Sequence, residues 1–385
     1  MRYLSCAKAV ITRRLPIYVH YGITHRCNLN CRMCGLWKLG DQKTELTLPQ
    51  IQQLAKNLGK LGTAAISLGG GEPFLRPDLP EIITAFRGQG IEVRVLTNGL
   101  VKNEELIQRV LDTGLRHISI SLDTLQAEVQ DDVCNRPGAW KEIIEAVRFW
   151  ADKLRPRRGL GVLNCVVSKL NFRMLPKMLQ VAEAYGFFLS LVPIELHHYQ
   201  EKDLGCRDSF SDMPFQPEDH RELRNIFAQL SEAKSQGHSH LFNSTPYLHY
   251  IQEYLTGQPL HGFVCRAGAL SFSVSPEGRY SMCHYYSGLG HRAQAPAPKH
   301  EPVISAADPG FVDWYRRSHV ATVTSLTARP CHRCFRPCWQ EINLAFTHPV
   351  AFFEALHLQS TPPIPETLPT PEELQERLGL TPKEP

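Results

Sequence analysis

Short apolar runs alternate with longer amphipathic segments through the first half of the chain. Six of these runs are rich in Val, Ile and Leu and are apolar almost throughout, which is typical of parallel strands covered on both faces. We therefore predict strands at Ile17–Thr24, Ala64–Leu68, Ile91–Leu96, His117–Leu122, Gly161–Val167 and Phe187–Val192.

The segments between these runs carry apolar residues three and four positions apart, and this spacing predicts helices. The predicted helices are Leu48–Leu58, Asp78–Gly88, Asn103–Thr113, Ala139–Leu154 and Leu175–Tyr185. Consecutive strand–helix units predict an α/β fold with a parallel sheet, either doubly wound or curled into a partial barrel. In both architectures functional groups gather at the carboxyl ends of the strands. The segments that follow the first four strands should therefore form one site: His25–Cys34, Gly69–Pro73, Thr97–Gly99, and Ser121 with Asp123.

The pattern changes after the sixth strand. The predicted elements there are an irregular segment at Glu201–Pro217, a helix at Pro217–Gln236, a β-hairpin at Phe263–Tyr286, a cysteine knuckle at Cys331–Trp339, and a Pro-rich tail after Gln359 in which Thr370 caps a short helix. We expect the chain to divide into an N-terminal extension (1–16), an α/β core (17–215), a helical linker (216–260), a small C-terminal domain with the hairpin and knuckle (261–345) and the tail (346–385).

Composition excludes several classes of protein. Hydrophobic residues make up 43% and charged residues 21%, as in ordinary soluble proteins. The net charge of 42 − 38 = +4 is not gathered in runs, which argues against a nucleic-acid partner. No apolar stretch approaches the ~18–20 residues of a membrane span, and Met1–Leu15 lacks the long apolar region of a secretory or twin-arginine signal. We expect a cytoplasmic protein without a membrane partner.

The cysteines point to bound metal. There are 12 of them, and in a reducing cytosol clustered cysteines more often bind metal or catalyse reactions than form disulfides. Cys27, Cys31 and Cys34 have the spacing C-x3-C-x2-C on the loop after the first strand. Three thiolates this close can hold three corners of an iron–sulfur cubane and leave the fourth iron open. A zinc site completed by His25 is the alternative that this spacing leaves.

Together with Gly70-Gly71-Glu72-Pro73, Thr97-Asn98-Gly99 and Ser121-Leu122-Asp123, this cysteine motif resembles the radical S-adenosylmethionine (radical SAM) superfamily over roughly residues 16–195. The resemblance implies a partial (β/α)6 barrel, a [4Fe-4S] cluster on the three catalytic cysteines, and S-adenosyl-L-methionine bound at the open iron. One electron from the cluster would cleave the sulfonium C–S bond, and the resulting 5′-deoxyadenosyl radical would abstract a substrate hydrogen.

The resemblance also assigns roles to single residues. The positions that match cofactor-binding residues of the family are Met33, Gly70, Gly71, Glu72, Pro73, Asn98, Ser121, Asp123 and Arg136. The glycines would let the backbone approach the methionine amine, with Glu72 beside it. Ser121 and Arg136 would contact the methionine carboxylate, and Asp123 would lie near the ribose or the substrate. Met33 departs from the family, which prefers an aromatic residue there; its thioether can still pack on adenine.

A second cysteine set comprises Cys265, Cys283, Cys331, Cys334 and Cys338. Cys265 and Cys283 form C-x12-G-x4-C across the predicted hairpin, and Cys331 and Cys334 complete four ligands. This set resembles the twitch type of the SPASM auxiliary domain and implies one auxiliary [4Fe-4S] cluster. Cys338 is an alternative ligand, and a structural zinc knuckle is the alternative for the whole set. Cys6, Cys134, Cys165 and Cys206 fit neither set, and Cys165 is predicted to be buried in its strand.

The sequence therefore predicts a metal-binding radical SAM oxidoreductase that oxidises, epimerises or rearranges a biosynthetic small molecule. It would draw electrons from a reductant such as flavodoxin or ferredoxin. Because fewer than 20 residues precede the first strand, we expect neither a cobalamin-binding domain nor a peptide-recognition winged helix there. Maturation of a peptide or protein by the same radical chemistry is one alternative. A non-catalytic iron–sulfur electron carrier or scaffold is the other.

Overall fold

The structure is a computed structural model that describes residues 15–40, 45–194, 212–236, 240–282, 304–319, 335, 337–357 and 363–380. Six strands alternate with helices and pair side by side in chain order, all parallel, and a C-terminal hairpin adds two more strands to give the order β6-β5-β4-β3-β2-β1-β7-β8. Their bounds are β1 Tyr18–Thr24, β2 Ala65–Gly70, β3 Glu92–Thr97, β4 His117–Ser121, β5 Leu160–Val167, β6 Phe188–Pro193, β7 Ser271–Val274 and β8 Tyr280–Ser281.

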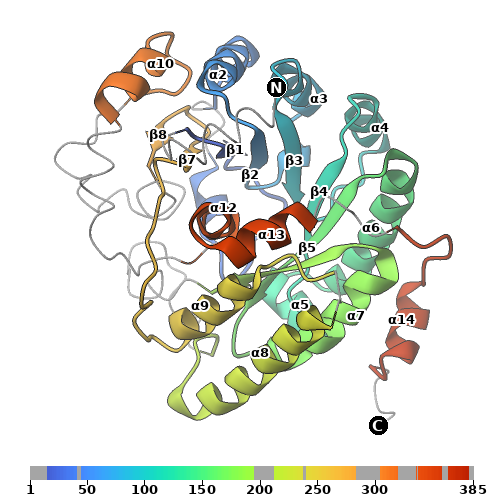
Figure 1. Cartoon of the computed structure of the whole chain (residues 1–385). Helices are drawn as coiled ribbons and strands as arrows, with labels where there is room; N and C mark the ends of the chain where they lie inside the picture. Colours follow the sequence, from blue (N-terminus) through green and yellow to red (C-terminus); the bar gives the residue numbers. More distant parts are fainter. Residues whose placement is uncertain are drawn as a thin grey trace.

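Helices cover the outer face of this curved sheet (Figure 1). The longer ones are α2 Leu48–Leu61, α3 Leu79–Arg87, α4 Glu104–Asp112, α5 Ala127–Cys134, α6 Ala139–Leu154, α7 Leu175–Tyr185, α8 His220–Ser235, α9 Thr245–Leu255, α12 Pro337–Thr347, α13 Pro349–His357 and α14 Pro371–Arg377. Short turns of helix lie at η1 Leu36–Leu39, η3 Pro73–Leu75, η4 Arg155–Arg157, η5 Phe172–Met174, η9 Pro217–Asp219, α10 Phe311–Trp314 and η10 Tyr315–His319.

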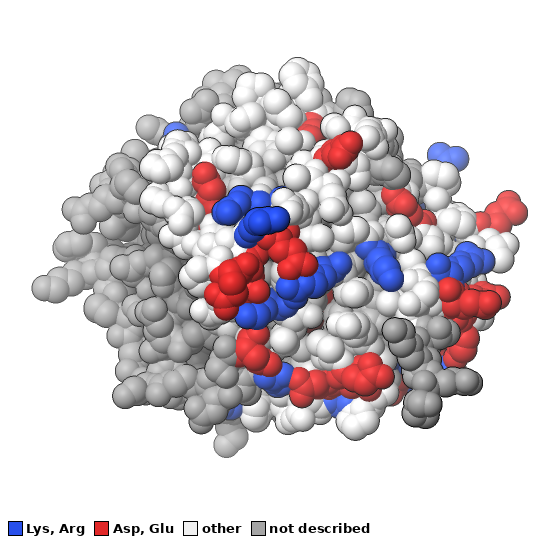
Figure 2. Space-filling view, turned by 90° about the horizontal axis from the view of Figure 1, so that it is seen from below, with Lys and Arg blue, Asp and Glu red and all other residues white. Residues whose placement is uncertain are grey.

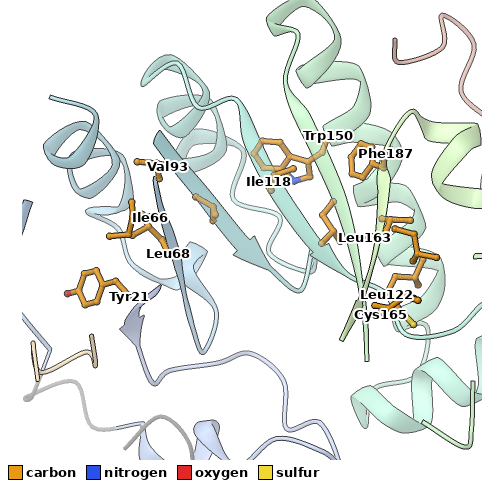
Figure 3. Packing of buried hydrophobic residues seen from close by; sticks show 14 of the residues in the cluster. Tyr21, Ile66, Leu68, Val93, Ile118, Leu122, Trp150, Leu163, Cys165 and Phe187 are labelled. Carbon is orange, nitrogen blue, oxygen red and sulfur yellow. The ribbon is translucent and has the colours of Figure 1, made fainter. Parts of the chain in front are cut away.

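The core lies between the sheet and its helices. Side chains such as Ile66, Val93, Ile118 and Leu163 are fully buried and come from neighbouring strands (Figure 3). Trp150 of α6 is also buried and lies beside Ile118. Burial on both faces explains why β2 and β6 are buried almost throughout, whereas β3 alternates between half-buried and buried positions. The predicted open, parallel α/β barrel is thus confirmed, and its six core strands lie within a few residues of the predicted bounds.

The sheet does not close on itself, and α12 lies in the opening. This helix contacts β6 on one side and both β1 and β7 on the other. Its Ile342 and Phe346 pack against Ile17 and Leu270, which lie at the starts of β1 and β7. A helix of the C-terminal region therefore helps to hold the two edges of the open barrel together.

The predicted hairpin is present, but it is not separate from the barrel. Its turn lies at Ser275–Gly278, as expected, and β7 pairs in parallel with β1 from Tyr18↔Ser271 to Tyr21↔Val274. The division at residue 261 therefore does not separate two sheets, because β7 extends the same sheet. The sequence did not reveal this pairing, since a four-residue strand carries no sign of its partner.

The C-terminal segment differs from the expected extended tail. Residues 349–357 form α13, which the sequence analysis missed together with α5, α9 and α12. Farther on, Ile364 and Leu368 are buried, and Tyr185 of α7 donates a hydrogen bond to the carbonyl of Pro369 at 2.9 Å. The short helix capped by Thr370 is confirmed as α14, and Thr370 accepts a hydrogen bond from the backbone N–H of Glu373. The tail is thus docked on the barrel.

On the face drawn in Figure 2, Lys and Arg lie beside Asp and Glu, so neither charge forms a large patch of its own there. Ion pairs such as Arg109–Glu81 and Arg173–Glu222 likewise bring opposite charges together. No helix within the described ranges combines the length and the apolar character that crossing a bilayer requires.

The docking of α14 gives a testable prediction. Leu374 is 2% exposed, and a buried Leu→Ala change usually costs about 2–5 kcal/mol. We expect Leu374→Ala to release α14 and to speed limited proteolysis there by roughly thirtyfold or more. Glu376→Ala, at an exposed position of the same helix, is the matched control and should be cut at the wild-type rate. Equal rates for both variants would show that α14 is not held by this side chain.

Candidate active site at the carboxyl ends of the strands

The three cysteines of the first motif lie on the loop that leaves β1. Cys27, Cys31 and Cys34 are each half-buried, and the N–H of Cys34 donates to the carbonyl of Cys31 at 3.1 Å. Burial raises the pKa of the Cys27 thiol to about 11. A hydrogen bond with Cys134 and burial together raise the pKa of Cys31. Thiols must lose their protons to bind metal, so binding here would release protons.

The loop crosses the end of β2 at very close range. The N–H of Gly71 donates to the carbonyl of Thr24 at 2.7 Å, and the N–H of Glu72 donates to that of Arg26 at 2.8 Å. A Cβ at Gly70 would lie 2.4 Å from the Thr24 oxygen, and one at Gly71 would lie 2.0 Å from the Arg26 oxygen. Gly70 also has a φ of +106°. Glycine is therefore required at both positions because the cysteine loop passes so close to the end of β2. The motif alone did not reveal this reason.

A buried ion network fixes the start of the cysteine loop. Arg76 is 5% exposed and donates to the carbonyl of Ile23 at 3.0 Å and to both carboxylate oxygens of Asp78. Glu45 accepts from Arg26 at 3.2 and 3.3 Å and from the hydroxyl of Thr24. These contacts fix the backbone just before the first cysteine. The sequence analysis did not find them, because their members are scattered through the chain.

Glu72 is fully buried at the end of β2. Its carboxylate accepts hydrogen bonds from the N–H of Phe74 at 3.1 Å, the hydroxyl of Thr97 at 2.9 Å and the N–H of Asn98 at 2.8 Å. Burial raises the pKa of Glu72 to about 7, while these three donors favour the charged form. Glu72 thus ties the turn after β2, which includes the buried Pro73, to the end of β3. Its contact with the methionine amine stays a prediction.

Asn98 points from the end of β3 to the cysteine loop. Its amide nitrogen lies 3.9 Å from the sulfur of Cys27 and donates to the side-chain oxygen of Asn28 at 2.7 Å. Its own oxygen accepts from the N–H of Leu100 at 2.9 Å, which fixes the orientation of the amide. Asn98 is therefore adjacent to the first cysteine.

The end of β4 carries one exposed and one buried polar residue. Ser121 is exposed, whereas Asp123 is 5% exposed and accepts from the N–H of Val166 on β5 at 2.8 Å. Burial raises the pKa of Asp123 to about 7. The carbonyl of Asp123 accepts from the thiol of Cys165 at 3.2 Å, and Figure 3 shows that Cys165 lies near Leu122. Asp123 therefore fastens β4 to β5, and Cys165 is buried as predicted.

Arg136 and Met33 occupy contacts within the chain. Arg136 donates to both carboxylate oxygens of Glu142, in the first turn of α6, at 2.9 and 3.0 Å. Any contact between Arg136 and the methionine carboxylate would be made alongside this ion pair. Met33 is half-buried and packs against the hydrophobic core. The expected contacts of both residues with the nucleoside stay predictions.

The hairpin turn reaches the cysteine loop. His25, which is 6% exposed, pairs with Glu277 at 2.9 Å, and Glu277 also accepts from the hydroxyl of Ser275 at 2.5 Å. Burial raises the pKa of Glu277, but the hydrogen bonds from His25 and Ser275 outweigh this effect and lower the pKa to about 2. Residues 252 positions apart in the sequence thus meet at the base of the cysteine loop. His25 is here a hydrogen-bond partner of the hairpin.

Only part of the second cysteine set lies within the described residues. Cys265 is half-buried just before β7, and the amide nitrogen of Gln340 on α12 lies 3.9 Å from its sulfur. Asn343, one turn farther along α12, donates to the carbonyl of Val264 at 2.6 Å. Cys338 belongs to α12, although its side chain is not described. The cysteines that lie outside the described residues are Cys6, Cys206, Cys283, Cys331 and Cys334.

No group of three or more His, Cys, Asp or Glu side chains within the described residues is arranged to hold a single metal ion. Two features of the site were missed from the sequence, namely Asn28 as the partner of Asn98 and Cys134 as the partner of Cys31. A lone Asn and a cysteine outside both motifs give no sequence signal for either contact.

Comparison with known proteins shows which family the barrel resembles. Residues 21–182 match the family model of the Radical SAM superfamily. This segment runs from β1 into α7 and includes all four motifs at the carboxyl ends of β1 to β4. The matched part of the chain is therefore similar to proteins of the radical SAM superfamily.

Curated relatives differ in what they act on. An AdoMet-dependent heme synthase of Methanosarcina barkeri is 28% identical over 44% of this chain and 48% of its own. A PqqA peptide cyclase of Granulibacter bethesdensis is 30% identical over 43% of each chain. A probable GTP 3′,8-cyclase of Thermococcus kodakarensis is 26% identical over 68% of this chain and 82% of its own. The chain spans about half the length of the first two relatives.

Solved structures share the fold. Streptococcus suis SuiB bound to S-adenosylmethionine matches 84% of this chain and 71% of its own with a TM-score of 0.60 and 14% identity. The anSMEcpe structure with bound AdoMet and the Cp18Cys peptide matches 89% of this chain and 99% of its own with a TM-score of 0.56 and 14% identity. At these identities the likeness confirms the open-barrel fold.

The raised pKa of Glu72 makes stability depend on pH. Between the ordinary pKa near 4.5 and about 7 the folded protein binds more protons than the unfolded chain, so stability is highest at low pH and falls as pH rises. Relative to Glu72→Gln, we expect wild type to lose up to about 3 kcal/mol of unfolding free energy between pH 5 and pH 8.

Urea unfolding of both proteins at each pH measures this difference. Glu128→Gln, at an exposed position of α5, controls for the substitution itself. A constant difference between wild type and Glu72→Gln across this pH range would mean that Glu72 keeps its ordinary titration in the folded protein.

Proposed function

We propose that this protein is a radical SAM enzyme that modifies a peptide substrate. The chemistry rests on the three thiols of Cys27, Cys31 and Cys34 at the carboxyl ends of the strands, inside the segment that matches the family. A [4Fe-4S] cluster on these thiols would supply the electron that cleaves S-adenosylmethionine to the 5′-deoxyadenosyl radical, which abstracts a substrate hydrogen. An external reductant such as flavodoxin or ferredoxin would return an electron to the cluster.

The donor set fits such a cluster. Three half-buried thiols share one loop, the amide of Asn98 faces the sulfur of Cys27, and backbone crossings fix the loop at its start. Thiolates are the usual ligands of iron–sulfur clusters, and hydrogen-bond donors near the sulfurs tune their potentials. Ser121 is exposed at the same edge, where a polar group of S-adenosylmethionine could reach it.

We assign the neighbouring residues to S-adenosylmethionine in two ways. Gly70, Gly71, Glu72 and Pro73 act chiefly by shaping the turn, because their groups are used in the chain's own contacts. Ser121 would contact the cofactor directly, and so would the parts of the Asn98 and Met33 side chains that are not used in contacts within the chain. Asp123 would position the ends of β4 and β5, and Arg136 would hold the start of α6 through Glu142. These roles extend the sequence predictions, with a smaller direct part for Glu72.

An auxiliary [4Fe-4S] cluster is the second part of the proposal. Its ligands would be Cys265, Cys283 and two of Cys331, Cys334 and Cys338. The observation that supports it is the contact of Gln340 with Cys265, because it brings the start of the hairpin beside the helix that carries Cys338. Such a cluster would exchange electrons with the substrate radical and would make the net reaction an oxidation.

A peptide substrate is favoured over a small molecule by the relatives. Among them are a PqqA peptide cyclase and, by fold, SuiB bound to a precursor peptide and anSMEcpe bound to a peptide. The sequence analysis ranked the small molecule first. One observation keeps it as a second candidate: the probable GTP 3′,8-cyclase matches this chain over 82% of its own length.

Metal content and cofactor cleavage test the chemistry. After anaerobic reconstitution we expect about eight iron per chain, or about four if only the barrel cluster forms. Changing Cys27, Cys31 and Cys34 together to Ala should remove about four iron and abolish 5′-deoxyadenosine production under dithionite. Cys165→Ala, which removes a buried thiol outside both sets, is the control and should retain both. Cleavage by the triple variant would overturn the assignment.

A cell extract can separate the two substrate classes. We expect an extract to stimulate 5′-deoxyadenosine production by the reconstituted enzyme, because substrate binding commonly couples to cofactor cleavage. If the substrate is a peptide, pretreating the extract with a protease that is then inactivated should remove the stimulation. Stimulation that survives protease and passes a small-pore filter would favour the small molecule. The triple cysteine variant provides the background in both arms.

A further inference from the structure

A side-chain amide at the end of β3 faces the first cysteine of the cysteine loop. The amide nitrogen of Asn98 lies 3.9 Å from the sulfur of Cys27, in hydrogen-bonding geometry. Hydrogen bonds to sulfur are longer than those to oxygen, because the sulfur atom is larger. Both residues are half-buried, so water competes less for this contact than it would at the open surface.

Two contacts leave this amide one orientation. Its oxygen accepts from the N–H of Leu100 at 2.9 Å, so flipping the amide would place two donors against each other. Its nitrogen therefore faces the cysteine loop, where it donates to the side-chain oxygen of Asn28 at 2.7 Å. A primary amide has two N–H groups, and Asn28 takes one of them. The other is left for the sulfur of Cys27.

A buried carboxylate fixes the backbone that carries this amide. The N–H of Asn98 donates to Glu72 at 2.8 Å, and the hydroxyl of the preceding residue, Thr97, donates to the same carboxylate at 2.9 Å. Glu72 is fully buried, and its own N–H donates to the carbonyl of Arg26 at 2.8 Å. Glu72 therefore holds Asn98 on one side and the chain just before Cys27 on the other.

Ligation would give this contact its direction and its effect. A cysteine that binds metal is a thiolate and can only accept hydrogen bonds. A hydrogen bond to a ligand sulfur draws negative charge away from a cluster and favours its reduced form. We propose that Asn98 is a positioning residue that donates a hydrogen bond to the Cys27 thiolate and thereby raises the reduction potential of the barrel cluster. This inference rests on the proposed function, because it needs a cluster on the three thiols.

The midpoint potential of the barrel cluster in the reconstituted full chain tests the role of Asn98. Redox titration is followed by electron paramagnetic resonance, and the barrel cluster is recognised by the change in its signal when S-adenosylmethionine is added. Asn98→Leu removes both N–H donors with little change in size. At the wild-type midpoint we expect it to lower the ratio of reduced to oxidised cluster by about threefold to tenfold.

A second substitution separates the donor from the turn that the same side chain supports. Asn98→Asp keeps the oxygen that accepts from Leu100 but has no N–H to donate. It also adds a negative charge beside the cluster, so we expect a larger fall in the ratio than for Asn98→Leu. A shift in Asn98→Leu alone would show that the turn sets the potential. A shift in Asn98→Asp alone would show an effect of charge, and either result would overturn the proposal.

Asn103 provides a matched control on the same segment. It is exposed at the start of α4, where its side-chain oxygen likewise accepts from a backbone N–H, that of Leu106, at 3.0 Å. Asn103→Leu and Asn103→Asp make the same chemical changes and should leave the potential of the barrel cluster at its wild-type value. Equal shifts at Asn98 and Asn103 would show that the substitution itself, rather than loss of the donor to Cys27, moves the potential.

The remaining outcomes are also decisive. Unchanged potential in Asn98→Leu, with iron content equal to wild type, overturns the hydrogen-bond role while leaving the proposed function standing. Loss of about four iron from both Asn98 variants would show that Asn98 holds the cluster in place and would overturn its effect on the potential. If one variant alone loses iron, Asn98→Ala replaces Asn98→Leu, or Asn98→Ser, which keeps an oxygen at the turn, replaces Asn98→Asp. Wild-type protein that shows no signal responsive to S-adenosylmethionine would overturn the proposed function, and this inference with it.

Discussion

The close crossing of the cysteine loop over the end of β2 is the constraint on which the site depends. Two backbone hydrogen bonds join Thr24 and Arg26 to Gly71 and Glu72, at a separation that leaves no room for a Cβ on the β2 side. Because these backbone hydrogen bonds hold the loop there, its three cysteines start from a fixed point. The ion network around Arg76 then holds the same stretch from the other side.

Around this crossing, buried polar groups connect the strand ends to each other. Glu72 joins β2 to β3, and Asp123 joins β4 to β5. Burying a carboxyl group disfavours its charged form, which is why the pKa of each is raised to about 7 despite the hydrogen bonds. The edge of the barrel is thus rigid at some cost in stability, and such a cost is common where geometry serves function.

The sequence predicted the sheet well because parallel strands buried on both faces are short and apolar throughout. It also predicted that the four motifs lie at the carboxyl ends of the strands, since each motif directly follows one of four consecutive strands. It could not predict contacts whose partners lie far apart, such as His25 with Glu277, because no local pattern encodes them. It also misjudged the Pro-rich tail, whose Ile364 and Leu368 are buried against the barrel although their spacing indicated no regular element.

The pairing of β7 with β1 gives the C-terminal region a direct connection to the site. β1 carries the cysteine loop at its carboxyl end, and β7 runs beside it in the same direction, so the turn after β7 emerges at the same edge. Glu277 in that turn is the partner of His25, two residues before Cys27. Cys265 precedes the same strand at the opposite edge, beside α12. A single pair of strands therefore links Cys265, a proposed ligand of the auxiliary cluster, to the loop that would hold the catalytic cluster.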